Sequence, residues 1–433
     1  MISRSLIATP WDAPALAAWN GRHPLPVSLL GDTDEFAFTG DLSPATPAGL
    51  DAVKHWAGVL HDDLVAGGRV DSAAASSFIT SRDLASQVQM ATPADLLFLH
   101  TCPMTLAQRP WAIHVEMLLP MFEPYFGHFR TWDIDLQATP AWHMVRHLLR
   151  HPNCRAILTH VRRTQEDLPR LFRDERLAAK IHYAPLGLSL DEAAHSLAAQ
   201  AVARKNARAS DDEFTVLFTN SWHQDGDSFF KRGGLEAVLG FLLFLELCPR
   251  ARLVLRTRLP AQLNDGMRTF LRRHPQIELH ENPVSDAQLF GLLTRADAFV
   301  LPSANLHTIS LLRAMAFGAV IVTTDVVAID EFIAQGETGI VLPGRRGSTY
   351  REDREQGLLR ERPEPLREMD ASLTAGIGAA LLKLATDGEF ATRLRAAARR
   401  QVGTAHAPGP WRAGFHAMLR AALAPKTASG SGA

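Results

Sequence analysis

The chain has 433 residues, of which 46% are hydrophobic and 21% are charged, and its net charge is −1. This length predicts two or three domains, and the balanced charge excludes an overall field that would attract nucleic acid or an anionic membrane. The composition also excludes a disordered chain and a disulfide-rich scaffold. The amino terminus lacks the apolar run of a signal peptide, and the 3 cysteines are widely spaced, so we expect a cytoplasmic protein with reduced thiols.

The first half of the chain becomes regular only after residue 90. Before it we expect short helices and loops; after it, short apolar runs alternate with helical patterns, which is typical of a parallel sheet covered on both faces. The expected strands are residues 94–101, 110–117, 154–161 and 180–187, with helices at 140–152 and 163–174. A polar, alanine-rich stretch, 188–212, is expected to lead into a second domain.

The second half shows a clearer alternation, which predicts a doubly wound α/β domain. Its expected strands are residues 214–220, 252–258, 277–283, 297–303, 320–325 and 338–344. Its expected helices are residues 233–248, 261–273, 285–296, 306–318, 329–335, 371–386, 388–402 and 411–423. The apolar helix 233–248 contains two glutamates and is too short to span a bilayer, so we expect it in the core. The charge-dense segment 345–370 is expected to form a loop.

Two strand-to-helix turns of this second half suit an anion. At the first, Lys231 and Arg232 precede Gly233 and Gly234 at a helix start. Glycine lets the backbone approach a phosphate, the helix dipole favours negative charge, and the cations complete the neutralisation. A solvated helix start is the alternative. The second turn joins the strand ending at Pro302-Ser303 to the helix that begins near His307.

Taken together, residues 214–402 resemble the carboxy-terminal domain of retaining GT-B glycosyltransferases of family 4, the glycosyl transferases group 1. In that family a strand is followed by Lys-Gly opening a helix, and here Arg232-Gly233 falls on that pair. Next come a strand ending in Pro-Ser, Glu-x7-Glu, Ala-Met-Ala-x-Gly, Glu-hydrophobic-hydrophobic and Gly-x-Thr-Gly. The matching residues are Pro302-Ser303, Ala314-Met315-Ala316-Phe317-Gly318, Glu331-Phe332-Ile333 and Gly336-Glu337-Thr338-Gly339.

The chain departs from the family at charged positions. The two glutamates of Glu-x7-Glu fall on Asn305 and Arg313, and the arginine after the first strand of this domain falls near Ser221. In the family the first glutamate contacts the donor sugar and the second binds the ribose, for which an arginine offers no acceptor. We expect Asn305 to bind the donor sugar and Glu331 to bind the ribose. We expect Arg313 to form an ion pair with Asp330 or Glu331.

The resemblance implies an α/β protein of the GT-B fold, with two Rossmann-like domains facing a cleft. The implied parts are an acceptor-binding domain at 1–187 (1–90 atypical), a connection at 188–212, a nucleotide-sugar-binding domain at 213–405, a helix at 406–425 crossing back to the first domain, and a disordered tail at 426–433. The implied activity is retaining transfer of a hexose from a nucleotide sugar to an acceptor hydroxyl, in bacterial surface glycan or glycoconjugate synthesis. No cofactor or metal is implied, and in the implied mechanism the leaving diphosphate itself can accept the proton of the acceptor.

The implied site has a donor side and an acceptor side. The donor phosphates would be bound by Lys231, Arg232 and Gly233 with the helix start at His307, Thr308 and Ile309, and Trp222 could stack on the base or replace the missing arginine. On the acceptor side, His114 and Glu116 end a strand where the family places acceptor groups. A plain core role for these two residues is the alternative.

Other polar patterns are less specific. D-x-D, which binds a divalent metal in a different glycosyltransferase fold, occurs at Asp32, Asp133 and Asp225, which shows how common the pattern is among 46 acidic residues. The basic cluster in 143–155 suits an anionic acceptor or a peripheral membrane contact, with a solvated helix face as the alternative. The acceptor could be a glycan, a lipid-linked group or a protein. Because both glutamates are missing, an inactive GT-B protein that binds a glycan or a partner transferase is the alternative function; a nucleotide-sugar epimerase is a third.

Overall fold

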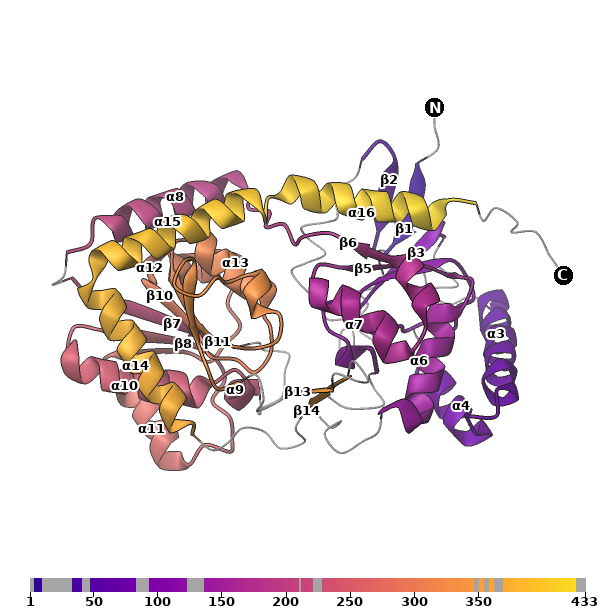
Figure 1. Ribbon diagram of the computed structural model, residues 1–433, viewed down its shortest axis with the longest axis horizontal. Coiled ribbons are helices and arrows are strands. Elements are labelled where there is room, and N and C mark those ends of the chain that lie inside the picture. The colour runs from indigo at the N-terminus through magenta and orange to yellow at the C-terminus, as the bar shows by residue number, and fades with distance from the viewer. Residues whose placement is uncertain are drawn as a thin grey trace. The chain divides into compact units, whose positions relative to one another are not determined.

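The computed structural model describes residues 4–9, 33–40, 47–82, 93–122, 136–209, 212–220, 228–345, 350–353, 358–361 and 369–425. The chain divides into two compact units (Figure 1). The first comprises Met1–Leu186, Asp353–Leu359 and Gly409–Ala433, and the second comprises Gly187–Glu352 and Arg360–Pro408. Each unit holds its own six-stranded sheet, and every strand pair described in these two sheets is parallel.

The sheet of the first unit has the strand order β2-β1-β3-β4-β5-β6. Its strands are β1 (Ser5–Ala8), β2 (Phe36–Thr39), β3 (Leu96–His100), β4 (Trp111–His114), β5 (Cys154–Thr159) and β6 (Ile181–Tyr183). Its helices are α3 (Pro47–Ala66), α4 (Ser72–Thr80), η2 (Leu119–Phe122), η3 (Leu136–Ala138), α6 (Pro140–Arg150), α7 (Arg162–Phe172) and η4 (Glu175–Lys180). The central strands β3 and β4 are buried along their whole length, as expected for a sheet with helices on both faces.

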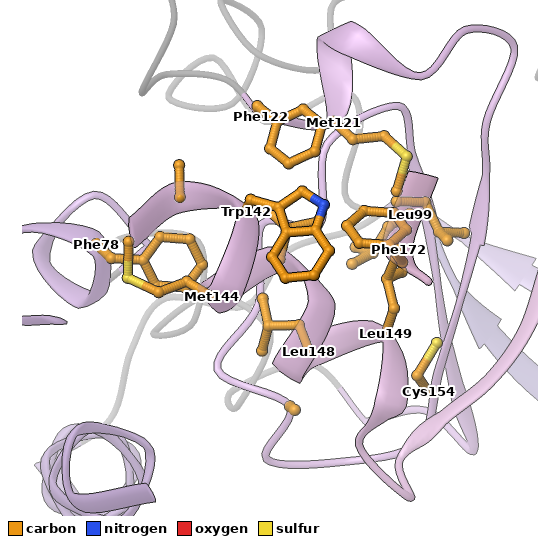
Figure 2. Packing of buried hydrophobic residues seen from close by; sticks show 14 of the residues in the cluster. Phe78, Leu99, Met121, Phe122, Trp142, Met144, Leu148, Leu149, Cys154 and Phe172 are labelled. Atoms are coloured by element: carbon orange, nitrogen blue, oxygen red, sulfur yellow. The ribbon is translucent and has the colours of Figure 1, made fainter. Parts of the chain in front are cut away.

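The core of the first unit gathers around Trp142 of α6, whose indole lies beside Phe122 and Phe172 in Figure 2. The rings of Trp142 and Phe172 stack with centroids 5.9 Å apart. The indole Nε1 donates to the carbonyl of Leu171 at 3.0 Å, so its buried polar atom is satisfied. Helix α6 begins at Pro140, directly after Thr139, whose side chain caps it. Its buried apolar residues follow the helical spacing expected from the sequence.

The last helix, α16 (Pro408–Leu423), packs on the first unit although it follows the second in the chain. The ring of Phe415 lies 5.0 Å from that of Phe98 on β3 and 6.0 Å from that of Phe38 on β2. A Cβ added to Gly414 would lie 2.5 Å from the Cβ of Ala184, which explains why a glycine stands at this contact. Helix α16 therefore contributes core residues to the first unit.

The sheet of the second unit has the strand order β12-β11-β10-β7-β8-β9. Its strands are β7 (Thr215–Thr219), β8 (Arg252–Arg256), β9 (Ile277–His280), β10 (Ala298–Leu301), β11 (Val320–Thr324) and β12 (Gly339–Leu342). Its helices are α8 (Glu192–Asn206), α9 (Ser228–Lys231), α10 (Gly234–Leu247), α11 (Asp265–Arg273), α12 (Asp286–Arg295), α13 (Thr308–Ala316), η5 (Ile329–Glu331), α14 (Ala371–Thr386) and α15 (Gly388–Thr404). Within this unit α10 packs against α14, α8 against α12, and α13 against α15.

Four sequence expectations differ from this fold. The first 90 residues hold β1, β2 and the 20-residue helix α3, where only short helices and loops are expected. The connection 188–212 contains α8, whose start is capped by Asp191. The helix expected at 329–335 is only the 3-10 turn η5. The loop expected at 345–370 contains two paired strands, β13 (Tyr350–Asp353) and β14 (Leu358–Glu361). The expected disordered tail, 426–433, lies outside the described residues.

The apolar segment expected as a core helix is α10. Among the described residues, no helix is long and apolar enough to cross a membrane. None of the three cysteines is joined in a disulfide.

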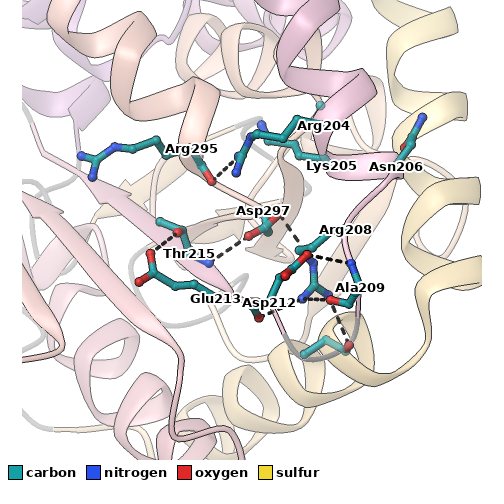
Figure 3. A network of polar contacts seen from close by, with 12 residues as sticks. Arg204, Lys205, Asn206, Arg208, Ala209, Asp212, Glu213, Thr215, Arg295 and Asp297 are labelled. Carbon is teal, nitrogen blue, oxygen red and sulfur yellow. Dashed lines mark hydrogen bonds and ion pairs between the residues drawn. The ribbon is translucent and has the colours of Figure 1, made fainter.

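Basic residues at the end of α8 bind the carboxyl ends of neighbouring helices in the second unit (Figure 3). The Nζ of Lys205 donates to the carbonyls of Leu293, at 2.8 Å, and Phe317, at 2.7 Å. Arg204 donates to the carbonyls of Thr294 and Arg295, at 2.8 and 2.9 Å. Terminal carbonyls of helices lack partners within their own helix, so Arg204 and Lys205 of α8 supply the donors that these carbonyls need. Burial lowers the pKa of Lys205 to about 7.

We expect Lys205→Met to lower the free energy of unfolding by about 2–4 kcal/mol, because two buried carbonyls lose their donor. Urea denaturation of the wild type and the variant measures this loss. Lys383→Met, which removes an exposed lysine from α14 in the same unit, serves as the matched control. Equal stability of the Lys205 and Lys383 variants would contradict the prediction.

Candidate functional site

The strand order of the second sheet marks one position for a ligand. The chain runs outward from β7 through β8 to β9, and from the neighbouring β10 through β11 to β12. In doubly wound sheets of this order, ligands bind outside the carboxyl ends of the strands where the direction reverses. Here that point lies after β7, at Asn220, and after β10, at Pro302 and Ser303.

The end of β7 is tied to the helix start that carries the predicted phosphate turn. Asn220 is buried, and its Nδ2 donates to the Oγ of Ser228 at 2.9 Å and to the Oγ1 of Thr257 at 3.2 Å. Ser228 is the first residue of α9, so this bond anchors the short helix directly on the ends of β7 and β8. Helix α9 in turn ends at Lys231, where the turn into α10 begins.

The two turns singled out in the sequence are in direct contact. Gly233 has φ +70°, and a Cβ added to it would lie 2.3 Å from the carbonyl oxygen of Pro302. The backbone N–H of Ala304 donates to the carbonyl of Lys231 at 2.7 Å. A glycine is therefore required here twice, for the left-handed backbone conformation and for the close approach of the segment after β10.

We expect Gly233→Ala to cost about 2–3 kcal/mol of folding stability and to weaken nucleotide binding, because the Cβ forces this turn away from Pro302. Gly336→Ala is the matched control: Gly336 has φ +74°, but a Cβ there meets nothing within 4 Å. Thermal unfolding and calorimetric titration with nucleotides measure the two effects. If both variants bind nucleotide equally well, the close approach to Pro302 has no role in binding.

Lys231 and Arg232 are buried, with exposed fractions of 7% and 8%, so the alternative of a solvated helix start is wrong. Burial and the positive charge of Arg256 lower the pKa of Arg232 to about 9, which leaves the guanidinium charged at neutral pH. Burying cations so close together is unfavourable unless an anion or dipole compensates it. Whether Lys231, Arg232 and Gly233 bind a phosphate stays a prediction.

The second turn leads into the amino terminus of α13. His307 precedes the helix, and its side chain forms no cap hydrogen bond to the first turn; its Nε2 lies 3.0 Å from the Oγ of Ser303. The same hydroxyl accepts the N–H of Asn305 at 3.0 Å. Thr308 and Ile309 are buried in the first turn. Ser303 thus fixes the loop that brings Asn305 and the helix start to this end of the sheet.

Arg313 forms an ion pair, as expected, but the expected partner is wrong. Its Nη2 lies 3.4 Å from Asp286 on α12, and its guanidinium lies 5.5 Å from the ring centre of Phe290, one turn further on. The residues expected to pair with it, Asp330 and Glu331, are close in sequence but lie beyond β11, in η5. Arg313 therefore pairs with a residue of the neighbouring helix α12 and not with a residue close to it in the sequence.

Several other candidates fall on residues that the structure does not describe. Trp222 and the D-x-D aspartates at 32, 133, 135, 225 and 227 lie outside the described residues. Glu331 is half-buried in η5, and its binding to the ribose stays a prediction. Among the described residues, no group of three His, Cys, Asp or Glu side chains could hold a metal ion.

In the first unit, three histidines stand at the carboxyl ends of three adjacent strands. His100 ends β3, His114 ends β4, and His160 directly follows β5. Their rings stack in series, with centroids 5.1 and 5.0 Å apart and interplanar angles of 10° and 6°. The edge of this stack meets Trp411 of α16, whose ring lies 6.2 Å from His114 and 6.0 Å from His160. These imidazoles are buried, so they form part of the sheet's end rather than of a solvated surface.

The ring nitrogens and Glu116 form one linear chain of contacts. The Nδ1 atoms of His100 and His114 are 3.1 Å apart, and His114 Nε2 lies 2.8 Å from His160 Nδ1. His160 Nε2 lies 3.4 Å from the Oε1 of Glu116. When Glu116 is ionised, a proton on His160 Nε2 faces the carboxylate; His160 Nδ1 then accepts from His114 Nε2, and His114 Nδ1 accepts from His100 Nδ1. Because each imidazole both donates and accepts, such a chain is able to pass a proton.

Backbone strain lies beside this chain. Thr101, which follows His100, has φ +63°, an uncommon conformation for a β-branched residue. Its N–H donates to the carbonyl of His114 at 2.7 Å, which helps to hold the strained turn. Strain of this kind persists where the surroundings determine the conformation, and it concentrates at functional sites. The sequence singled out His114 and Glu116 as site residues but not His100 or His160; the signal was a histidine at the end of three successive apolar strands.

Part of the second unit matches a known protein family. The family model described as "Glycosyl transferases group 1" matches residues 250–352. Over these residues the chain is similar to the glycosyl transferases group 1. The match includes β8 through β12 and the whole 302–318 motif, whereas the turn at Lys231 precedes it. The family resemblance noted in the sequence is therefore confirmed. No curated protein matches the chain.

Solved structures of glycosyltransferases share the fold over almost the whole chain. A UDP-forming α,α-trehalose-phosphate synthase from Burkholderia vietnamiensis is 14% identical, with 98% of each chain covered and a TM-score of 0.56. A glycosyltransferase from Rickettsia africae ESF-5 is 11% identical, with 98% of this chain and 99% of that chain covered and a TM-score of 0.51. HepE of Anabaena, solved with UDP and glucose, is 9% identical, with 96% and 99% covered and a TM-score of 0.51. At such identities the likeness establishes the fold, and the expected α/β fold with two Rossmann-like units is confirmed as that of GT-B proteins.

Proposed function

We propose that this protein is a glycosyltransferase that moves a hexose from a nucleotide-sugar donor to an acceptor hydroxyl, with retention of the anomeric configuration. The observation that carries the proposal is the packing of the Gly233 turn against Pro302 at the carboxyl ends of β7 and β10. This contact assembles two buried cations, Lys231 and Arg232, and the start of α13 on one group of strand ends. The group 1 match over residues 250–352 supports the same activity.

The proposed donor site stabilises the diphosphate as it leaves. Lys231 and Arg232 supply positive charge, and the backbone N–H groups at His307, Thr308 and Ile309 supply hydrogen-bond donors at the start of α13. Charge-assisted hydrogen bonds in a buried setting are the strongest of these contributions. These groups neutralise the diphosphate in place of a metal ion, and the leaving diphosphate itself accepts the proton of the acceptor hydroxyl in place of a separate base. Asn305 hydrogen-bonds the donor sugar, and Glu331 accepts from the ribose hydroxyls.

The proposed acceptor side uses His114 and Glu116. Both stand at the carboxyl end of β4, and the contact of Glu116 with His160 at 3.4 Å joins them to the imidazole chain. The side chain of Glu116 keeps 16% of its surface exposed, whereas that of His160 has none, so an acceptor would meet the carboxylate first. The acceptor is a glycan, a lipid-linked group or a protein of bacterial surface glycan synthesis, and the enzyme acts in the cytoplasm.

The test is a panel of nucleotide sugars with uracil, guanine, adenine and thymine bases. We expect one base to raise the melting temperature through binding to the native state, and its nucleotide sugar to be hydrolysed slowly when no acceptor is added. The free nucleoside diphosphate should compete with the sugar nucleotide for the same site. A panel in which no nucleotide changes the melting temperature would contradict the proposed donor site.

One observation favours a second function, a non-catalytic GT-B protein that binds a glycan or a partner transferase. Asn305 and Arg313 replace both carboxylates of the family motif, and Arg313 is held by Asp286 at 3.4 Å. The same panel separates the two functions. A protein that binds a nucleotide without hydrolysing its sugar or transferring it to any acceptor would support the non-catalytic alternative.

A further inference from the structure

Arg256, the last residue of β8, lies across the end of the neighbouring strand β7. The N–H of Asn220 donates to the carbonyl of Arg256 at 2.8 Å, and the Nη1 of Arg256 donates back to the carbonyl of Asn220 at 3.0 Å. This second bond carries the guanidinium from β8 to the residue that directly follows β7. The end of β7 is the position where the strand order reverses, and ligands bind at this position in such sheets.

This position is where the sequence lacks a cation. The group 1 resemblance has an arginine after the first strand of the domain, and it falls near Ser221 in this chain. The backbone of residue 220, one position earlier, is the acceptor of the Arg256 guanidinium. A positive charge is thus present at the end of β7, but it is supplied by the adjacent strand.

Arg256 belongs to a group of arginines at this end of the sheet. Burial and the charge of Arg256 lower the pKa of Arg232. Burial lowers the pKa of Arg256, Asp286 on α12 raises it, and Arg313 lowers it. Asp286 also pairs with Arg313, and its side chain is 70% exposed. Like charges brought together under partial burial repel one another, and a multivalent anion is the ligand that relieves this repulsion.

We propose that Arg256 is a phosphate-binding residue that replaces the arginine absent after β7 and contacts the diphosphate of a nucleoside diphosphate. This inference rests on the proposed function, since it concerns the same donor site. The diphosphate carries more than one negative charge, and a guanidinium presents two parallel N–H donors to phosphate oxygens. Arg256 would therefore discriminate nucleoside diphosphates from nucleosides rather than one base from another.

A purely structural role is the competing explanation, because the Asn220 bond alone would hold β7 and β8 together. Two substitutions separate the roles. Arg256→Gln keeps a donor for the Asn220 carbonyl and removes the charge, whereas Arg256→Lys keeps the charge. Arg252→Gln is the matched control, because it removes the same charge from the opposite end of β8, where Arg252 pairs with Glu213.

The experiment is calorimetric titration of each full-length variant with UDP, GDP, ADP and TDP and with the matching nucleosides, at two salt concentrations. Arg256→Gln should bind the preferred diphosphate roughly ten- to one-hundredfold more weakly and depend less on salt. Its nucleoside affinity should equal that of the wild type, Arg256→Lys should bind with intermediate affinity, and Arg252→Gln should bind like the wild type.

The contrary outcomes are distinct. If the wild type binds a diphosphate and Arg256→Gln binds it equally well, the proposal for Arg256 is overturned while the proposed function stands. The same holds if Arg256→Gln only melts at a lower temperature, since that is the signature of the structural bond. If the wild type binds none of the diphosphates, the donor site and the role of Arg256 both fail.

Discussion

A variant with both Lys231→Met and Arg232→Met is expected to bind its nucleoside diphosphate at least one hundredfold more weakly than the wild type. Each charge-assisted hydrogen bond that is lost contributes about 1.5–3 kcal/mol, so two of them exceed this factor. Methionine is chosen because both side chains are buried, with 7% and 8% of their surface exposed, and alanine would leave cavities in the fold. Calorimetric titration measures the affinity directly.

The control for this variant removes two charges elsewhere in the same unit. Arg399→Met with Arg400→Met changes two consecutive arginines of α15, neither of them buried. The backbone bond from Ala304 to the Lys231 carbonyl does not depend on either side chain, so the turn itself should persist in the test variant. Far-ultraviolet circular dichroism and the melting temperature verify that it has folded. Unchanged diphosphate affinity in a folded Lys231 and Arg232 variant would remove these residues from the donor site.

The sequence was sufficient for those parts of the fold in which local pattern and tertiary environment agree. Strands such as Leu96–His100 and Val320–Thr324 are buried along their whole length, and a short unbroken apolar run predicts such a strand. The short strands Ser5–Ala8 and Phe36–Thr39 escaped prediction because each contributes only four residues and pairs in register with the other across 31 positions of sequence. These two strands can be recognised only from their pairing with each other in the sheet.

The candidate site also has parts that the sequence predicts and parts that it does not. The turn at Gly233 was predictable, because glycines after cations at a helix start form a local signal with a physical cause. The partners of each residue were not predictable: His100 and His160 lie 14 and 46 positions from His114 and meet it only because three parallel strands end side by side. Arg256 likewise reaches Asn220 across a sheet register that the sequence does not contain.

The two replaced glutamates offer the sharpest choice between an active and an inactive protein. In an active transferase with a rebuilt site, Asn305 hydrogen-bonds the donor sugar and Arg313 stays with Asp286, so carboxylates at 305 and 313 should disturb a site that works without them. In an inactive descendant of an active enzyme, the same two carboxylates restore the ancestral donor contacts. The change in nucleotide affinity therefore has opposite signs in the two cases.

We expect Asn305→Glu with Arg313→Glu to bind the preferred nucleotide sugar about tenfold more weakly than the wild type, because the proposed amide contact with the donor sugar is lost and two negative charges are added near a site for an anion. Arg313→Glu also places a carboxylate beside Asp286, which is 3.4 Å from Arg313 in the native pair, and this repulsion could lower affinity by distorting α12 and α13. Adding Asp286→Asn removes the repulsion while keeping the side chain's size. If the triple variant melts like the wild type and still binds more weakly, the loss arises in the donor site. If it binds more tightly than the wild type, the site has lost its function and the non-catalytic alternative is correct.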